Sequence, residues 1–315
     1  MMRPGLRLLA ASIGSSAALF LDGVQVGSVQ SVFSRAINVL VADRMVCLVR
    51  SDVGRGPMNV VLDVGEGLSL TSVGVQPGMR IRKQGTRLVL GEGVVTVELP
   101  PVAAGAPSRR PRPLRDVSRA AGNLERLRKD ILLRGNLAGF GNLLSEPAAG
   151  LDVGSPQVTP AAKAASRPLR EMVRALSRSD LDPVPEAARS LIGLGPGLTP
   201  AADDVLVGLM IALLLASKAL GREDDFAERA NACISSEVGG RTTRLSMEFL
   251  LHAARGLGGE RTVCLLEQVL FGRAEDVDSA ALRLFEVGAT SGTDTAFGVL
   301  LGVAASLEAK RRAWT

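Results

Sequence analysis

Short β-strands are predicted in the first third of the chain. Between residues 79 and 99, apolar and polar positions alternate, and the alternation breaks at Gly85 and at Gly91 to Gly93, as in a series of hairpins. Two more Val-rich runs, at 37–51 and 58–73, are separated by Gly, Asp or Asn. Runs of this length and spacing, from about residue 18 to 99, predict a small barrel or sandwich.

After a proline-rich stretch at 100–113, the spacing of apolar residues becomes helical. Helical spacing is found at 114–137, 161–179, 224–238, 245–257 and 261–272. Two further segments, 203–220 and 293–309, are apolar nearly all round, which predicts helices buried at the centre of the domain. The predicted fold is α+β, with a β-rich domain at 1–105, a connector at 106–116 and a mainly helical domain at 117–315.

Neither apolar segment that resembles a membrane or export signal has the expected form. The start of the chain carries Arg3 and Arg7 ahead of apolar residues, but Ser and Gly at positions 12 and 14–16 dilute that run, so we do not expect a signal peptide. The longest apolar run, Val205 to Ala216, is shorter than the roughly 20 residues of a spanning helix. We therefore expect a cytoplasmic protein with no membrane span, and three free cysteines at 47, 233 and 264 fit a reducing compartment.

The composition argues against nucleic acid as a partner. The formal net charge is +5, but nine of the 37 Lys and Arg residues lie between 109 and 134, which is the connector and one amphipathic helix. Aromatic residues make up 3% of the chain and tyrosine is absent, so platforms for stacking bases are not expected. The one histidine, His252, shares a helical stripe with apolar residues, which favours a core position.

The most informative stretch is "GLGPGLTPAADD" at 193–204, directly ahead of a predicted buried helix. Thr199 and Pro200 are typical of a helix start, with Thr as the cap and Pro at the first helical position. Asp203 and Asp204 fall in the first turn, where the helix dipole favours acids, so a purely structural interpretation is available. However, Gly195 and Gly197 exceed what a cap needs and would let the backbone approach a ligand, and helix starts bind anions.

A second helix start, at 288–307, resembles the first. A shift of 90 positions aligns Asp204 with Asp294 and Gly208 with Gly298, and the two glycines are expected to mark the crossing of the two central helices. If the helix starts converge, they bring six polar side chains around one pocket: Thr199, Asp203, Asp204, Ser291, Thr293 and Asp294. A third segment, "GGRTTRLS" at 239–246, supplies Arg241, which suits carboxylate or phosphate, together with Thr243 and Ser246.

Two ligand types fit amide donors beside carboxylates. One is a phosphate held with Mg²⁺, because hard cations take carboxylate and phosphate oxygens together. The other is a substrate with both an acid group and an amide, whose NH₂ would donate to an aspartate. The loop lacks the Gly-Lys-Ser/Thr ending of a phosphate-binding loop, so the sequence gives no support for ATP.

With these residues in view, the chain resembles the AllH-like family. The segments "GLGPGLTPAADD", "TSGTDTAFGVLLG" (290–302) and "TTRLSMEFL" look like the family's helical-domain motifs, and "SVFSRAINVLV" with "GPMNVVLD" is similar to its first domain. The resemblance implies a subunit of an oxamate carbamoyltransferase in allantoin-type nitrogen catabolism, with other protein subunits and a small anionic metabolite as partners: carbamoyl phosphate, phosphate, oxamate or oxalurate. One departure is that Ala201-Ala202 stands where the family usually has Ser-Gly, which removes a hydroxyl and adds a Cβ.

The residue types at the helix starts and the family resemblance together give each candidate residue an expected role. Asp203, Asp204 and Asp294 are the candidate catalytic residues and the candidate Mg²⁺ ligands. The candidate phosphate or substrate contacts are Gly195, Gly197, Thr199, Arg241, Thr243, Ser246, Ser291, Gly292 and Thr293. The alternative is a non-catalytic subunit that binds a metabolite or holds partner chains together, and the Ala201-Ala202 departure leaves it open.

Overall fold

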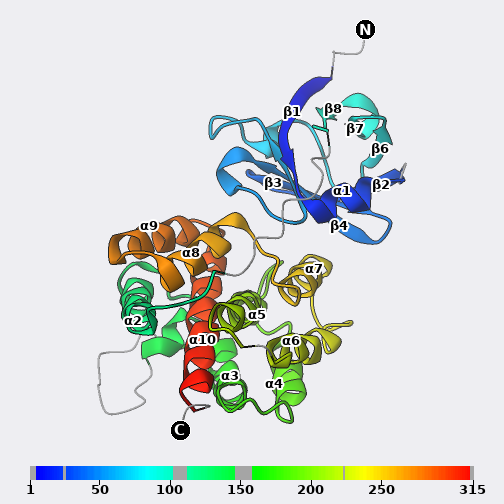
Figure 1. The fold of residues 1–315 in the computed structure, drawn as a ribbon. Coiled ribbons are helices and arrows are strands. Elements are labelled where there is room, and N and C mark those ends of the chain that lie inside the picture. The colour runs from blue at the N-terminus through cyan, green and yellow to red at the C-terminus, as the bar shows by residue number, and fades with distance from the viewer. Residues whose placement is uncertain (1–4, 24–25, 102–111, 146–157, 223, 313–315) are drawn as a thin grey trace. The chain divides into compact units, whose positions relative to one another are not determined.

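The computed structural model describes residues 5–23, 26–101, 112–145, 158–222 and 224–312. The chain divides into two compact units, Met1–Arg109 and Arg110–Thr315 (Figure 1). Most of the connector expected at 106–116 lies outside the described residues, which resume at 112. Each unit has its own cluster of buried apolar side chains, so each is described by itself.

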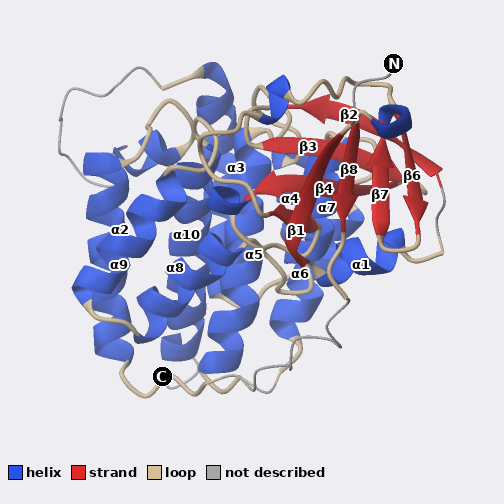
Figure 2. Ribbon diagram, turned by 90° about the horizontal axis from the view of Figure 1, so that it is seen from above, coloured by secondary structure: helices blue, strands red, loops and turns tan. Residues whose placement is uncertain are grey.

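The first unit is a closed eight-stranded barrel (Figure 2). Its strands are β1 (Leu6–Ile13), β2 (Val26–Val32), β3 (Ala36–Val41), β4 (Arg44–Arg50), β5 (Asn59–Leu62), β6 (Arg80–Gln84), β7 (Arg87–Leu90) and β8 (Val95–Glu98). Around the barrel they follow the order β1-β5-β4-β3-β2-β6-β7-β8. The β1–β8 and β4–β5 pairs are parallel and the others are antiparallel, so the predicted small barrel is confirmed in its closed form.

The alternation of buried and outward-facing side chains along the strands, together with the geometry of the turns, accounts for the barrel. Inward-facing side chains such as Ile81, Leu88 and Val97 are buried, while their sequence neighbours face outward. The β3–β4 hairpin turns through Ala42 and Asp43, both with positive φ (45° and 63°), the geometry of a tight two-residue turn that matches strand twist.

The β region begins earlier than the sequence predicted. Residues 6–13, in the apolar start of the chain, form strand β1, which closes the barrel by pairing with β5 and β8. The short helix α1 (Ser15–Leu21) follows and buries Ala17, Phe20 and Leu21 in the barrel core. The Ser and Gly residues that interrupt this run therefore mark the end of a strand and the start of a helix.

The second unit is helical. Its helices are α2 (Val117–Arg134), α3 (Pro160–Ser177), α4 (Val184–Leu191), α5 (Ala201–Ala219), α6 (Phe226–Ser236), α7 (Arg244–Ala253), α8 (Glu260–Phe271), α9 (Ala274–Phe285) and α10 (Ser291–Arg312). Helices α4 and α9 were not predicted. Both are amphipathic and no longer than 12 residues, and an apolar pattern over so few turns is weak.

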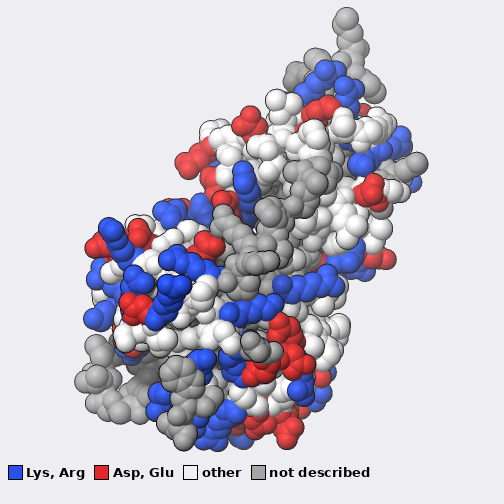
Figure 3. Space-filling model, in the orientation of Figure 1, with Lys and Arg blue, Asp and Glu red and all other residues white. Residues whose placement is uncertain are grey.

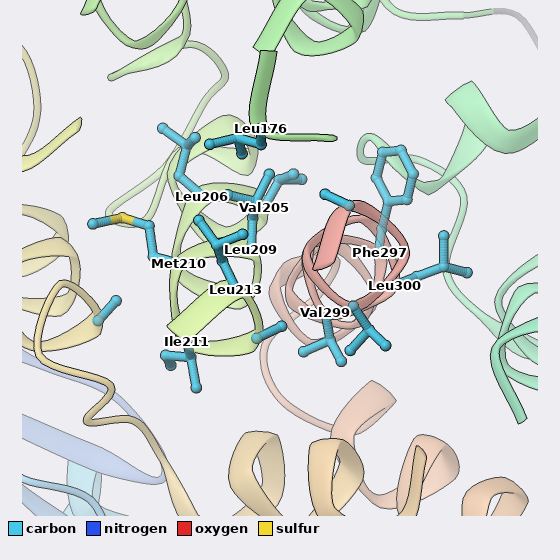
Figure 4. Packing of buried hydrophobic residues seen from close by; sticks show 14 of the residues in the cluster. Leu176, Val205, Leu206, Leu209, Met210, Ile211, Leu213, Phe297, Val299 and Leu300 are labelled. Atoms are coloured by element: carbon cyan, nitrogen blue, oxygen red, sulfur yellow. The ribbon is translucent and has the colours of Figure 1, made fainter. Parts of the chain in front are cut away.

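Helices α5 and α10 form the centre of this unit, as their all-apolar sequences predicted. Figures 1 and 2 show α10 between α2 and α5, and it also contacts α3, α8 and α9. Figure 4 shows the apolar side chains that surround the pair, including Leu209 and Leu213 of α5 and Val299 of α10. Along the pair, contacts advance in the same direction on both helices, from Gly298 against Val205 to Ser306 against Leu213, so α5 and α10 run parallel.

Glycine allows the two backbones to touch. A Cβ on Gly208 would lie 2.1 Å from the Thr295 carbonyl oxygen, and a Cβ on Gly298 would lie 2.0 Å from the Val205 carbonyl oxygen. The predicted close-packing role of these glycines is confirmed. Because Val205 and Thr295 are also related by 90 positions, the contact is reciprocal, and it fixes the two helix starts at the same end of the unit.

The surface carries mixed charge. On the face shown in Figure 3, basic and acidic side chains are interspersed over both units. Within the described part of the chain, no helix combines the length and the apolar character needed to cross a membrane.

Candidate functional site

The two helix starts meet. The hydroxyl oxygens of Thr199, ahead of α5, and Ser291, the first residue of α10, lie 3.1 Å apart. Since α5 and α10 run parallel from this point, the positive ends of both helix dipoles lie side by side. The structure thus brings together the two segments that the sequence analysis related by a shift of 90.

The start of α5 differs in detail from the prediction. Pro200, not Thr199, occupies the cap position, and no side chain caps the helix. Thr199 turns its hydroxyl to Ser291 instead. The preceding loop depends on glycine, because Gly193, Gly195 and Gly197 have φ values of 82°, 120° and 102°, in the left-handed region that other residues rarely adopt.

The loop retains free backbone donors. In the first turn of α5, the amides of Ala202, Asp203 and Asp204 already donate to the carbonyl oxygens of Leu194 and Pro200. Among the described residues, five amides in and after the loop have no protein acceptor: those of Gly195, Gly197, Leu198, Thr199 and Ala201. Pro196, Gly197 and Leu198 are exposed, so an anion can approach this loop from solvent.

Asp203 is fully buried and uses both carboxylate oxygens within the protein. Oδ1 accepts from the Gly193 amide (2.8 Å), and Oδ2 accepts from the hydroxyls of Ser246 (2.7 Å) and Thr242. These bonds connect the start of the glycine loop (residues 193–199) to the start of α7. Asp203 therefore positions the loop and the 241–246 segment relative to each other.

Asp204 is also buried, but its Oδ2 atom has no hydrogen-bond partner in the described part of the chain. Burial raises the pKa of Asp204 well above its usual range, the nearby hydroxyls of Ser291 and Thr199 oppose this rise, and the charge of Asp294 adds to it. A buried carboxyl group with one unused oxygen and a raised pKa can hold a proton or accept a donor from a ligand.

Asp294 is the counterpart of Asp204 in α10. Its Oδ1 accepts from the Phe140 amide (2.6 Å), and its Oδ2 is buried without a hydrogen-bond partner among the described residues. Burial raises the pKa of Asp294 to about 6, against the opposing effect of the Phe140 amide and the Thr290 hydroxyl. Near neutral pH this carboxyl group is close enough to its pKa to exchange a proton.

The remaining predicted site residues have mixed surroundings. Three side chains predicted to contact a ligand make hydrogen bonds within the protein instead. Thr243 caps α7 and donates to the Leu198 carbonyl oxygen (2.5 Å), and Ser246 donates to Asp203. Thr293 accepts from the Asn136 amide (3.0 Å). Gly292 is a packing position, since a Cβ there would lie 1.9 Å from the Leu284 carbonyl oxygen.

Among the described residues, the exposed guanidinium of Arg241 makes no hydrogen bond or ion pair. His252 is buried as predicted, and its Nδ1–H donates to the Glu248 carbonyl oxygen (2.6 Å).

Residues 136–142 belong to the site but were not predicted from the sequence. This stretch follows α2 and contacts the start of α10 through Thr293 and Asp294. A Cβ on Gly139 would lie 2.3 Å from Asp294 Oδ2, so any larger residue at this point would displace the Asp294 carboxyl group. The signal was a run rich in Gly and Asn, "GNLAGFGN" at 135–142, directly after an amphipathic helix.

The acids of the site fit a Mg²⁺ ion only in part. Within the described residues, no group of three or more His, Cys, Asp or Glu side chains is placed to hold a metal ion. Asp203 has both oxygens engaged by protein donors, so it does not fit a ligand role. Asp204 and Asp294 each keep an unused oxygen, and with phosphate oxygens these could supply ligands of the kind that Mg²⁺ prefers.

Comparison with known proteins bears on both units. A family model described as oxamate carbamoyltransferase subunit AllH matches residues 191–303, which contain the glycine loop, α5, the 241–246 segment and most of α10. A second model, the AllH family N-terminal domain, matches residues 9–105, which contain most of the barrel. No solved structure matches the chain. The two models together cover about two thirds of the sequence, so the chain belongs to the AllH family of oxamate carbamoyltransferase subunits.

Proposed function

We propose that this subunit binds a small anion carrying a phosphate and a carbamoyl group at the paired starts of α5 and α10. The observation that carries the proposal is the placement of free loop amides, from Gly195 to Ala201, next to two buried carboxyl groups with raised pKa. The amides suit the phosphate oxygens, and the carboxyl groups suit the carbamoyl NH₂ or a proton in transit.

The reaction proposed is carbamoyl transfer between oxalurate and phosphate, in cytoplasmic, allantoin-type nitrogen catabolism. A phosphate oxygen attacks the carbamoyl carbon of oxalurate, and the bond from that carbon to the nitrogen of the oxamate part breaks. The nitrogen takes up a proton, which gives oxamate and carbamoyl phosphate. Asp204 or Asp294 supplies this proton, because burial raises the pKa of both carboxyl groups above the ordinary value and so makes their protonated forms easier to reach. Mg²⁺ bound to one of these acids and the phosphate is the proposed cofactor.

Each loop element then has a role. The amides of Gly195, Gly197 and Thr199 hold the phosphate, while Arg241 and Ser291 contact oxygen atoms of the substrate. Asp203 keeps the loop and the Arg241 segment in register through its bonds to Gly193 and Ser246. Hydrogen-bond donors placed around the bound phosphate position it for attack on the carbamoyl carbon and stabilise its charge, so no covalent intermediate with the protein is needed.

The test is calorimetric titration of the purified chain with carbamoyl phosphate, with and without Mg²⁺. The Asp204→Asn variant is expected to bind about tenfold more weakly, since its amide replaces an unused acceptor next to the ligand. Asp182→Asn, at an exposed aspartate, is the matched control and should bind like the wild type. Equal affinity in the wild type and in Asp204→Asn would contradict the proposal.

A non-catalytic binding or scaffolding role is the second candidate. Asp203 has no oxygen left for chemistry, and Ala201-Ala202 lacks the hydroxyl expected from the family resemblance. Assays of carbamoyl transfer by the chain alone and together with its co-purified partner subunits separate the candidates. Ligand binding by the chain with transfer only in the assembly supports this second role.

A further inference from the structure

The 136–142 segment is held against the start of α10 by its backbone. The Asn136 amide donates to Thr293 Oγ1 (3.0 Å), and the Phe140 amide donates to Asp294 Oδ1 (2.6 Å). Gly139 and Gly141 pack against the side chains of Asp294 and Thr293. Residue 142 therefore follows directly after the backbone groups that surround the Asp294 carboxyl group.

Asn142, in the 3₁₀ turn η4 (Gly141–Ser145), has an unsatisfied side chain. It is 1% exposed, and both its Oδ1 and Nδ2 atoms are buried without a hydrogen-bond partner among the residues that the structure describes. Asn123, another buried asparagine of the same unit, donates to three carbonyl oxygens of the α8 region. Leaving a whole amide unpaired in the interior is unfavourable, so a group that satisfies it is expected.

The unsatisfied groups lie on elements that contact each other, because α10, which carries Asp294, contacts both the turn η4 of Asn142 and the helix α5 of Asp204. Asp204 and Asp294 each have a buried, unpartnered Oδ2, and the charge of Asp294 acts on Asp204. Asn142 adds one donor site and one acceptor site within two residues of the Phe140 amide that binds Asp294. A carbamoyl group complements this set, because its C=O accepts from an amide NH₂ while its own NH₂ donates to amide and carboxyl oxygens.

We infer that Asn142 is a binding residue that recognises the carbamoyl group, a role that rests on the proposed function. The side-chain amide pairs with the carbamoyl amide through two hydrogen bonds, one in each direction. Asn142 thus distinguishes carbamoyl phosphate from acyl phosphates that lack the NH₂ group, while the loop at Gly195 to Ala201 binds the phosphate common to both.

Binding measurements with three probes test this role. Carbamoyl phosphate, acetyl phosphate (a methyl group replaces NH₂) and inorganic phosphate are titrated into wild type, Asn142→Leu and Asn142→Ala. The wild type should prefer carbamoyl phosphate over acetyl phosphate by about tenfold, and both variants should lose this preference but still bind inorganic phosphate. If the variants keep the preference, the inference fails while the proposed function stands. If the wild type binds none of the probes, the proposed function fails and the inference with it.

Thermal melting separates a binding role from a structural one. Without ligand, Asn142→Leu should melt a few degrees above the wild type, because it removes an unpaired buried amide and keeps a similar volume. Asn123→Leu is the matched control and should melt lower, with unchanged ligand preference, because it breaks bonds to Gln268, Val269 and Gly272. A lower melting temperature for Asn142→Leu together with a retained ligand preference would overturn the inference.

Discussion

The hydroxyl oxygens of Thr199 and Ser291 lie 3.1 Å apart although 92 positions separate these residues in the sequence. The contact exists because α5 and α10 run parallel and touch through glycine, so both helices begin at the same place. Adjacent parallel dipoles with their positive ends together repel each other, and buried Asp204 and Asp294 supply negative or hydrogen-bonding groups at that end. The packing of the core and the chemistry of the site therefore have one origin.

The glycine contact predicts a strong sensitivity to small side chains. Gly298→Ala should lower the free energy of unfolding by about 2–3 kcal/mol, because its Cβ would lie 2.0 Å from a backbone oxygen that the packed pair cannot move away easily. Gly122→Ala in α2 is the matched control. It lies in a helix with no atom near the added Cβ, so it should be neutral or stabilise by about 0.5–1 kcal/mol. Chemical denaturation of both variants measures the difference, and a Gly298→Ala variant as stable as the wild type would contradict the close approach.

The three aspartates of the site should respond differently to substitution. Asp203→Ala leaves the Gly193 amide and two hydroxyls without their acceptor, so it should destabilise the chain by about 3 kcal/mol. Asp204→Asn should change stability by less than about 1 kcal/mol or increase it, because it removes a carboxyl group whose ionisation burial opposes. Denaturation curves of the two variants, measured side by side, check this. Equal losses would mean that Asp204 is as structural as Asp203.

The raised pKa of Asp294 should make the free energy of unfolding depend on pH, with a definite sign. Its folded-state pKa is about 6, above the ordinary value of 3.8, so between these two pH values the folded chain holds a proton that the unfolded chain has already released. This group therefore makes the free energy of unfolding fall as the pH rises from about 4 to about 6, by about 1.4 kcal/mol per unit of pKa difference, and has no further effect above that range.

Asp294→Asn should remove this contribution while keeping the acceptor for the Phe140 amide. Chemical denaturation at several pH values between 4 and 7 measures this contribution as the difference in free energy of unfolding between the wild type and the variant. Asp182→Asn, at an exposed aspartate, is the control. A difference that stays constant over the range would show that the pKa of Asp294 is not raised.

The Ala201 position predicts a gain of binding. A shift of 90 places Ala201 opposite Ser291, and the Ala201 amide is one of the free donors at the loop. Ala201→Ser should strengthen binding of carbamoyl phosphate by about threefold to tenfold, the value of one added hydrogen bond. Calorimetry compares it with Ala121→Ser on the exposed side of α2, which should not change affinity. If both variants bind like the wild type, the missing hydroxyl has no part in binding.

Much of the architecture could be predicted from the sequence because it depends on local patterns. Alternation over 79–99 predicted the β6–β8 strands, and all-apolar segments predicted α5 and α10. The early strand β1 was missed because its partners, β5 and β8, lie about 50 and 90 residues away, and an apolar run of eight residues does not by itself distinguish a strand from other structures.

The sequence by itself determined that two similar helix starts exist, with acids in their first turns and glycines one turn later. The tertiary structure alone decided which acid remains free. Asp203 is used up by donors 10, 39 and 43 positions away, whereas Asp204 and Asp294 keep an oxygen unpaired. It also brought the Phe140 amide to Asp294 in the first turn of α10, 154 positions away. Local propensity acts between neighbours in the chain, but burial and hydrogen-bond pairing depend on distant segments that meet only in the folded protein.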